Sequence, residues 1–82
     1  MNRLIIPQQI FDEMIAYCKE NYPNEACGIL AGKDNVVLKI YKMKNIENSP
    51  ITYMLDSKEQ FNVMKEIRQN NLSMLAIFHS HP

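Results

Sequence analysis

Two apolar segments on either side of a short polar turn constrain the fold of this chain more than any other feature. The first segment, residues 25–31, is EACGILA, and the second, residues 36–41, is VVLKIY. The residues between them, 32–35, are GKDN. Apolar runs separated by turn-forming residues predict a β-hairpin, and the β-branched residues of the second run favour a strand.

An amphipathic helix is predicted on each side of the hairpin. Pro7 suits the first turn of a helix, and Pro23 ends the apolar helical spacing that follows it. Asp56 is a candidate N-cap for the second helix, with Glu59 at the capping-box position, and residues 70–71 (NN) close it. The apolar positions are Ile10, Phe11, Met14, Ile15 and Cys18 in the first helix and Phe61, Met64 and Ile67 in the second.

Three further segments have strand character. Residues 4–6 predict a short strand or lead-in, and residues 51–55 (ITYML) predict a strand. The continuous apolar run at 72–78 (LSMLAIF) indicates a strand covered on both faces. The order of elements predicts one α/β domain over residues 1–82, with helices packed on a mixed β-sheet.

Composition narrows the classes of partner and location. Nine basic and nine acidic residues give zero net charge without a basic block, so we expect neither nucleic acid nor membrane as a partner. The apolar run before Pro7 is too short for a signal peptide, and no segment approaches the roughly 18 apolar residues of a membrane helix. A cytoplasmic protein is therefore expected. Cys18 and Cys27 could pair, but reduced thiols are the expectation in that compartment.

His79 and His81 follow the last predicted strand. In extended backbone, residues two apart point to the same face, so the two imidazoles would converge in a way that suits Zn²⁺. Pro82 favours extended backbone at His81. The alternative is a pair of exposed histidines without a ligand role.

Glu25 and Cys27 are the other candidates for chemistry. Glu25, at the start of an apolar strand, is either a solvated end residue or a carboxylate that moves a proton beside a metal-bound water. Cys27 would face the same side and could be a thiolate nucleophile activated by a histidine. Gly28 beside it favours tight packing instead.

Taken together, PNEACGILAG after an opening helix and a strand ending in FHSHP resemble the JAMM (MPN-plus, JAB-domain) metalloproteases. The resemblance is closer to short prokaryotic members, whose first motif is often E-x-C-G-x-L-x-G. It implies a cytidine-deaminase-like α/β fold, with Glu25 as general base and acid and with His79 and His81 as zinc ligands. It also implies hydrolysis of peptide or isopeptide bonds at the tails of ubiquitin-like or sulfur-carrier proteins.

The family motif continues with a serine and an aspartate that have no counterpart up to Pro82, and Ser80 cannot replace that serine. We therefore expect residues 1–82 to be the N-terminal portion of a JAMM domain, with its C-terminal part missing. Such a chain would bind zinc weakly and hydrolyse little. It would also leave an apolar strand edge that favours aggregation or a homodimer.

The sequence is compatible with three functions: a zinc metallopeptidase or isopeptidase, a non-catalytic MPN-type interaction module, and a thiol hydrolase using Cys27. A scaffold has no need of Glu25, His79 and His81 together, which favours the first. The whole interpretation requires Glu25 and the two histidines to meet in the folded molecule.

Overall fold

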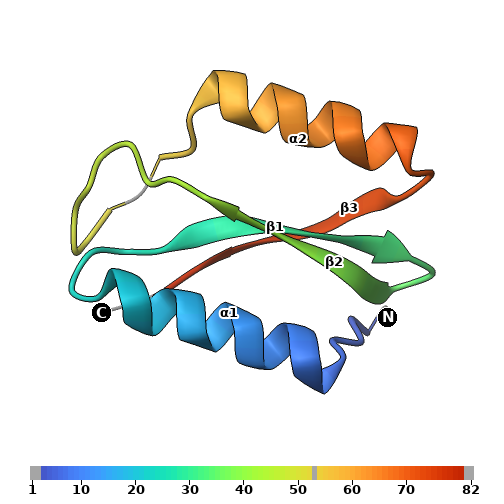
Figure 1. The fold of residues 1–82 in the computed structure, drawn as a ribbon, viewed down its shortest axis with the longest axis horizontal. Helices are drawn as coiled ribbons and strands as arrows, with labels where there is room; N and C mark the ends of the chain where they lie inside the picture. The colour runs from blue at the N-terminus through green and yellow to red at the C-terminus, as the bar shows by residue number, and fades with distance from the viewer. Residues whose placement is uncertain (1–2, 53, 81–82) are drawn as a thin grey trace.

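The computed structural model describes residues 3–52 and 54–80, which form two helices and one sheet. The elements in chain order are α1 (Gln8–Asn21), β1 (Cys27–Lys33), β2 (Val36–Met43), α2 (Ser57–Gln69) and β3 (Ser73–His79). The strands lie in the order β2-β1-β3, and the helices cover opposite faces of the sheet (Figure 1). The α/β fold predicted from the sequence is therefore confirmed.

The hairpin lies where the sequence predicts it. Its turn uses Asp34 and Asn35, whose φ angles are 50° and 68°; two successive positive φ values suit the twist of a tight hairpin. Both neighbours of β1 run antiparallel to it. The lead-in segment adds a parallel bridge between Ile5 and Val36.

The hydrophobic core lies between the sheet and α2. All residues of β1 from Cys27 to Gly32 are buried, because β1 is the central strand. The core cluster draws on β1, β2 and α2, and its buried members are Ile29, Ala31, Tyr41, Met43 and Ile67.

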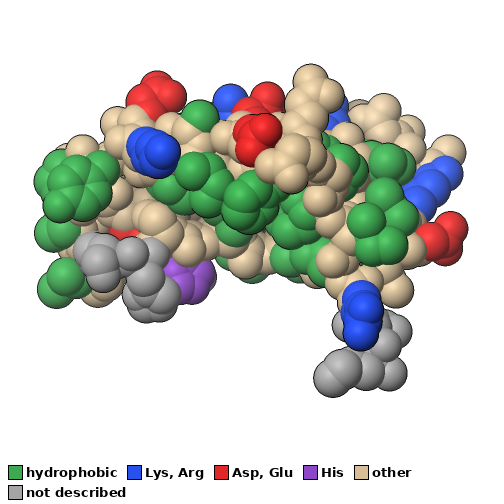
Figure 2. Space-filling model, turned by 90° about the horizontal axis from the view of Figure 1, so that it is seen from below, with side chains coloured by type: hydrophobic (Ala, Val, Ile, Leu, Met, Phe, Trp, Pro, Cys, Tyr) green, Lys and Arg blue, Asp and Glu red, His purple; other side chains and the backbone are tan. Residues whose placement is uncertain are grey.

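Helix α1 is less deeply packed than its apolar spacing predicts. None of its residues is buried, and Phe11 and Ile15 keep 43% and 37% of their surface exposed. Cys18, predicted on the apolar face, is half-buried. Apolar side chains accordingly spread across the face of the molecule seen from below α1 (Figure 2).

Neither helix within the described residues combines the length and apolarity that crossing a membrane requires.

Helix α2 begins with the predicted cap. The Asp56 carboxylate accepts a hydrogen bond of 3.1 Å from the Glu59 N–H. The carboxylate of Glu59 accepts instead from the backbone N–H of Lys44, also at 3.1 Å. The sequence predicts that the Glu59 carboxylate completes a capping box at the start of α2. In the structure it instead connects the start of α2 to the residue that follows β2.

Asp56→Ala is expected to lower the free energy of unfolding by about 1 kcal/mol, because the first turn of α2 loses its side-chain acceptor. Urea denaturation followed by circular dichroism would measure the change. Lys58→Ala, exposed in the same turn, is the matched control. Equal midpoints for the two variants would contradict the capping role.

Two strand predictions need correction. Strand β3 forms, but it lies at the edge of the sheet, so Met74 and Ile77 are 41% and 43% exposed rather than covered on both faces. Among the described residues of 51–55, Leu55 makes an isolated bridge to Asn45 in place of a full strand. The Thr52 carbonyl oxygen and the Met54 N–H instead form hydrogen bonds with the Asn45 side chain. Self-association through the outer edge of β3 stays a prediction.

Candidate active site

Glu25 and His79 contact each other at one end of the sheet. Glu25 precedes β1 by two residues, and the register of β1 with β3 places His79 opposite Cys27. Oε1 of Glu25 lies 2.6 Å from Nδ1 of His79. The end of α1 and the loop between β2 and α2 lie at this same end of the molecule (Figure 1). The fold therefore joins two side chains that are 54 positions apart.

The two side chains differ sharply in exposure. The Glu25 side chain is 2% exposed and that of His79 is 32% exposed. Within the described residues, Glu25 is the one charged side chain that is buried. A buried carboxylate is costly without a polar partner, and the short contact with the imidazole supplies one. His79 thus has one side against a buried acid while its ring reaches solvent.

Ser80 holds the end of β3 beside Glu25. Its hydroxyl oxygen accepts a hydrogen bond of 2.9 Å from the Ala26 N–H. Its own N–H donates to the Ala26 carbonyl oxygen, also at 2.9 Å. These bonds extend the antiparallel pairing past His79. This contact could not be predicted from the sequence, because it depends on the pairing of two segments that lie far apart along the chain.

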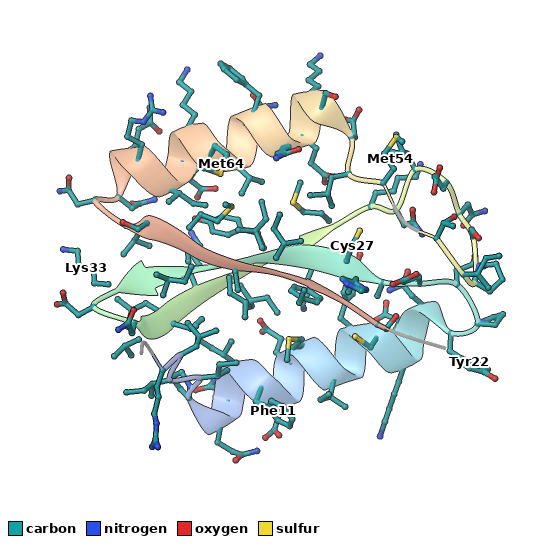
Figure 3. All side chains as sticks on the ribbon, turned by 180° about the vertical axis from the view of Figure 1, so that it is seen from behind. Phe11, Tyr22, Cys27, Lys33, Met54 and Met64 are labelled. Atoms are coloured by element: carbon teal, nitrogen blue, oxygen red, sulfur yellow. The ribbon has the colours of Figure 1, made fainter. Side chains whose placement is uncertain are left out.

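Cys27 is a core residue. Its side chain is fully buried, lies inside the molecule (Figure 3), and its Sγ donates to the Met43 carbonyl oxygen at 3.8 Å. Burial, with smaller contributions from Glu59 and Glu25, raises the pKa of the thiol to about 11. Both cysteines are free thiols. A thiolate nucleophile at neutral pH is therefore disfavoured, because the reactive form requires a lowered pKa.

The donor set at this end suits zinc in its chemistry. Imidazole nitrogen is a preferred zinc ligand, and the Glu25 carboxylate, 2.6 Å from Nδ1 of His79, would provide an acid–base group beside such a metal. The predicted ligand His81 lies outside the described residues. Among residues 3–52 and 54–80, no three His, Cys, Asp or Glu side chains gather as a metal-binding group.

Two cavities flank Glu25. One, of about 490 Å³, is mainly apolar and lies against the C-terminal part of α1; its lining includes Ile15, Cys18, Tyr22, Pro23, Glu25 and Ser80. The other, of about 390 Å³, is more polar; its lining includes Tyr17, Asn21, Glu25, Lys42, Lys44 and Asn45. Glu25 thus lines both hollows, although its side chain is only 2% exposed.

Known proteins resemble this chain over nearly its whole length. It is 38% identical over 78 residues to the desampylase of Pyrococcus furiosus, covering 95% of this chain and 55% of that protein. It is 35% identical over 80 residues to the CysO-cysteine peptidase of Mycobacterium tuberculosis, again covering 95% and 55%. A probable TtuB-protein conjugate cleaving protease of Thermus thermophilus is 32% identical, with 96% and 53% covered.

A solved structure shares the fold. The solution structure of a Desulfitobacterium hafniense protein superposes with a TM-score of 0.87 at 34% identity, covering 98% of this chain and 57% of that one. The chain thus spans about half the length of the curated relatives it matches. Residues 7–82 match the family described as prokaryotic homologs of the JAB domain. By this match and these identities, the chain belongs to the prokaryotic JAB-domain family.

Proposed function

We propose that this chain contributes the Glu25–His79 site of a zinc-dependent peptidase or isopeptidase. In this proposal Glu25 is the general base and acid, and His79 and His81 are zinc ligands. The substrates would be the C-terminal tails of ubiquitin-like or sulfur-carrier proteins, joined to an amine. The observation that carries the proposal is the buried Glu25 carboxylate 2.6 Å from the imidazole of His79.

Burial of Glu25 suits a proton-transfer role. A carboxylate held in a water-poor site beside one fixed partner can accept a proton from an attacking water and release it to the departing nitrogen. His79 would hold the carboxylate in one orientation through its Nδ1 contact. Bound zinc would supply Lewis acidity and a water with a pKa of about 7. The sheet register and Ser80 keep the strand end in place during these steps.

The substrate class is supported by the relatives and by the cavities. The matched proteins are named for desampylation, for CysO-cysteine cleavage and for TtuB-conjugate cleavage. Extended tails can follow a strand edge, where main-chain hydrogen bonds supply affinity. The apolar hollow beside Glu25 and Ser80 would receive residues next to the bond that is cut.

Two free thiols support the proposal of a cytoplasmic protein.

A non-catalytic interaction module is the competing function. It would need the fold but not a buried acid against a histidine, and such a pair adds little stability compared with apolar packing. The Glu25–His79 contact therefore favours an enzyme.

In a Cys18→Ala variant of the full-length protein, which lacks the half-buried thiol that lines the apolar hollow, hydrolysis is expected to stop with a chelator and to continue after treatment with iodoacetamide. The reason is that the proposed chemistry uses zinc, while the Cys27 thiol is buried and protonated. The assay substrate is a sulfur-carrier protein whose C-terminal carboxyl group is joined to the amine of a short peptide. Cys27→Ala would serve as a control that retains activity. Loss of activity on alkylation, with none on chelation, would favour the thiol hydrolase.

A further inference from the structure

One side chain, Asn45, joins the loop after β2 to the backbone of Glu25. Its Nδ2 donates hydrogen bonds to the carbonyl oxygens of Glu25 at 3.0 Å and Thr52 at 2.9 Å. Its Oδ1 accepts from the backbone N–H groups of Glu47 at 3.1 Å and Met54 at 3.0 Å. An amide has two donor hydrogens and two acceptor lone pairs, so this side chain uses its full capacity.

The same loop holds the other side of the Glu25 peptide. The Glu25 N–H donates to the carbonyl oxygen of Ser49 at 2.7 Å. The neighbouring Asn24 donates from Nδ2 to Oδ1 of Asn48 at 2.9 Å. Glu25 lies before the first residue of β1, so this loop, rather than the sheet, supports the main chain that carries the carboxylate.

The two partners of the candidate site are thus placed by different parts of the fold. His79 is placed by the pairing of β3 with β1, whereas Glu25 is placed by the loop. We propose that Asn45 is a positioning residue that sets the Glu25 carboxylate against His79; its kinetic consequence rests on the proposed hydrolytic function. Small displacements of a reacting group can lower rates by about 100-fold, so the loop would affect the rate through the position of Glu25.

Only an asparagine satisfies this arrangement. Aspartate has no donor when ionised, so Asn45→Asp would set a carboxylate oxygen against the carbonyl oxygens of Glu25 and Thr52. Glutamine keeps the amide but is one methylene longer, so it cannot keep all four bonds at these distances. Both variants should release Glu25 from the loop while leaving the paired strands intact.

The test is an NMR comparison of wild type, Asn45→Asp and Asn70→Asp. Asn70 is the matched control, because its Nδ2 donates to the Glu66 carbonyl oxygen at 2.9 Å at the far end of α2. In Asn45→Asp, we expect loss of the nuclear Overhauser effect between the Glu25 side chain and the His79 ring. Exchange of the Glu25 amide should rise by about 10-fold or more, with β1 amides unchanged. Asn70→Asp should show neither change.

Kinetics supply an independent readout. In Asn45→Asp, kcat should fall by about 10- to 100-fold with little change in KM, because positioning rather than binding is lost. If Asn45→Asp does not fold, Asn45→Ser carries the same measurements without the added charge. An intact Glu25–His79 contact in a variant whose loop amides exchange faster would overturn the proposal. If wild type hydrolyses nothing, the proposed function fails, and the NMR comparison still decides whether Asn45 positions Glu25.

Discussion

Glu25→Gln is expected to lower the hydrolytic rate by about 10²- to 10⁴-fold, the usual contribution of a general acid–base group. Glutamine has nearly the same shape and can still hydrogen-bond to His79, but it cannot accept the proton of the attacking water. The buried position of Glu25 leaves little room for solvent to replace it. The measurement is kcat for the full-length protein on a sulfur-carrier fusion, with thermal melting to show that the fold is kept.

Glu66→Gln is the matched control for that variant. Glu66 lies on α2 and contacts Lys39 at 3.1 Å, with both side chains nearly half exposed. Exposed ion pairs contribute little to stability, and Glu66 is remote from the candidate site, so neither rate nor melting should change. A Glu25→Gln protein that keeps more than about a tenth of the wild-type rate would rule out the acid–base role.

Gly28→Ala is expected to destabilise the sheet. A Cβ at Gly28 would overlap the Phe78 ring and the Tyr41 carbonyl oxygen, because the position lies between two strands in a closely packed region. Overpacking of this kind costs about 1–3 kcal/mol. Phe78 precedes His79, so its displacement would also disturb the candidate site. Urea denaturation, with activity measured in parallel, would test both effects.

Leu38→Ala supplies the comparison for Gly28→Ala. Leu38 lies on β2 with 55% of its surface exposed, so its truncation should change the free energy of unfolding by no more than about 0.5 kcal/mol. If Gly28→Ala unfolds at the same urea concentration as wild type, the neighbouring strands do not approach Gly28 as closely as the structure shows.

Local patterns were sufficient for the parts of the fold that depend on neighbours in sequence. The hairpin follows from its turn residues, and α2 follows from Asp56 and the helical spacing after it. The exposure of β3 could not be predicted in this way, because it depends on which strand takes the centre of the sheet. A continuous apolar run signals a strand but not its position, and β1 rather than β3 is the covered one.

In the candidate site too, some features are visible in the sequence and others depend on the fold. The spacing of His79 and His81 is visible in the sequence, and their link to Glu25 came from the family resemblance rather than from periodicity. The contact between Glu25 and His79 arises because strand register places His79, while the loop after β2 holds the backbone of Glu25. Asn45 could not be found from the sequence, because its importance comes from a loop that returns to Glu25. Polar loop residues carry no periodic signal that would indicate such a return.

The proposed function requires Glu25 and His79 to belong to one zinc-dependent hydrolytic centre. Anomalous diffraction at the zinc edge, from crystals of the full-length protein grown with zinc, tests it most directly. We predict a zinc peak within about 2.1 Å of an imidazole nitrogen of His79, with the Glu25 carboxylate beside it. A peak held by other residues, or a Glu25 carboxylate turned away from the ion, would contradict the proposal.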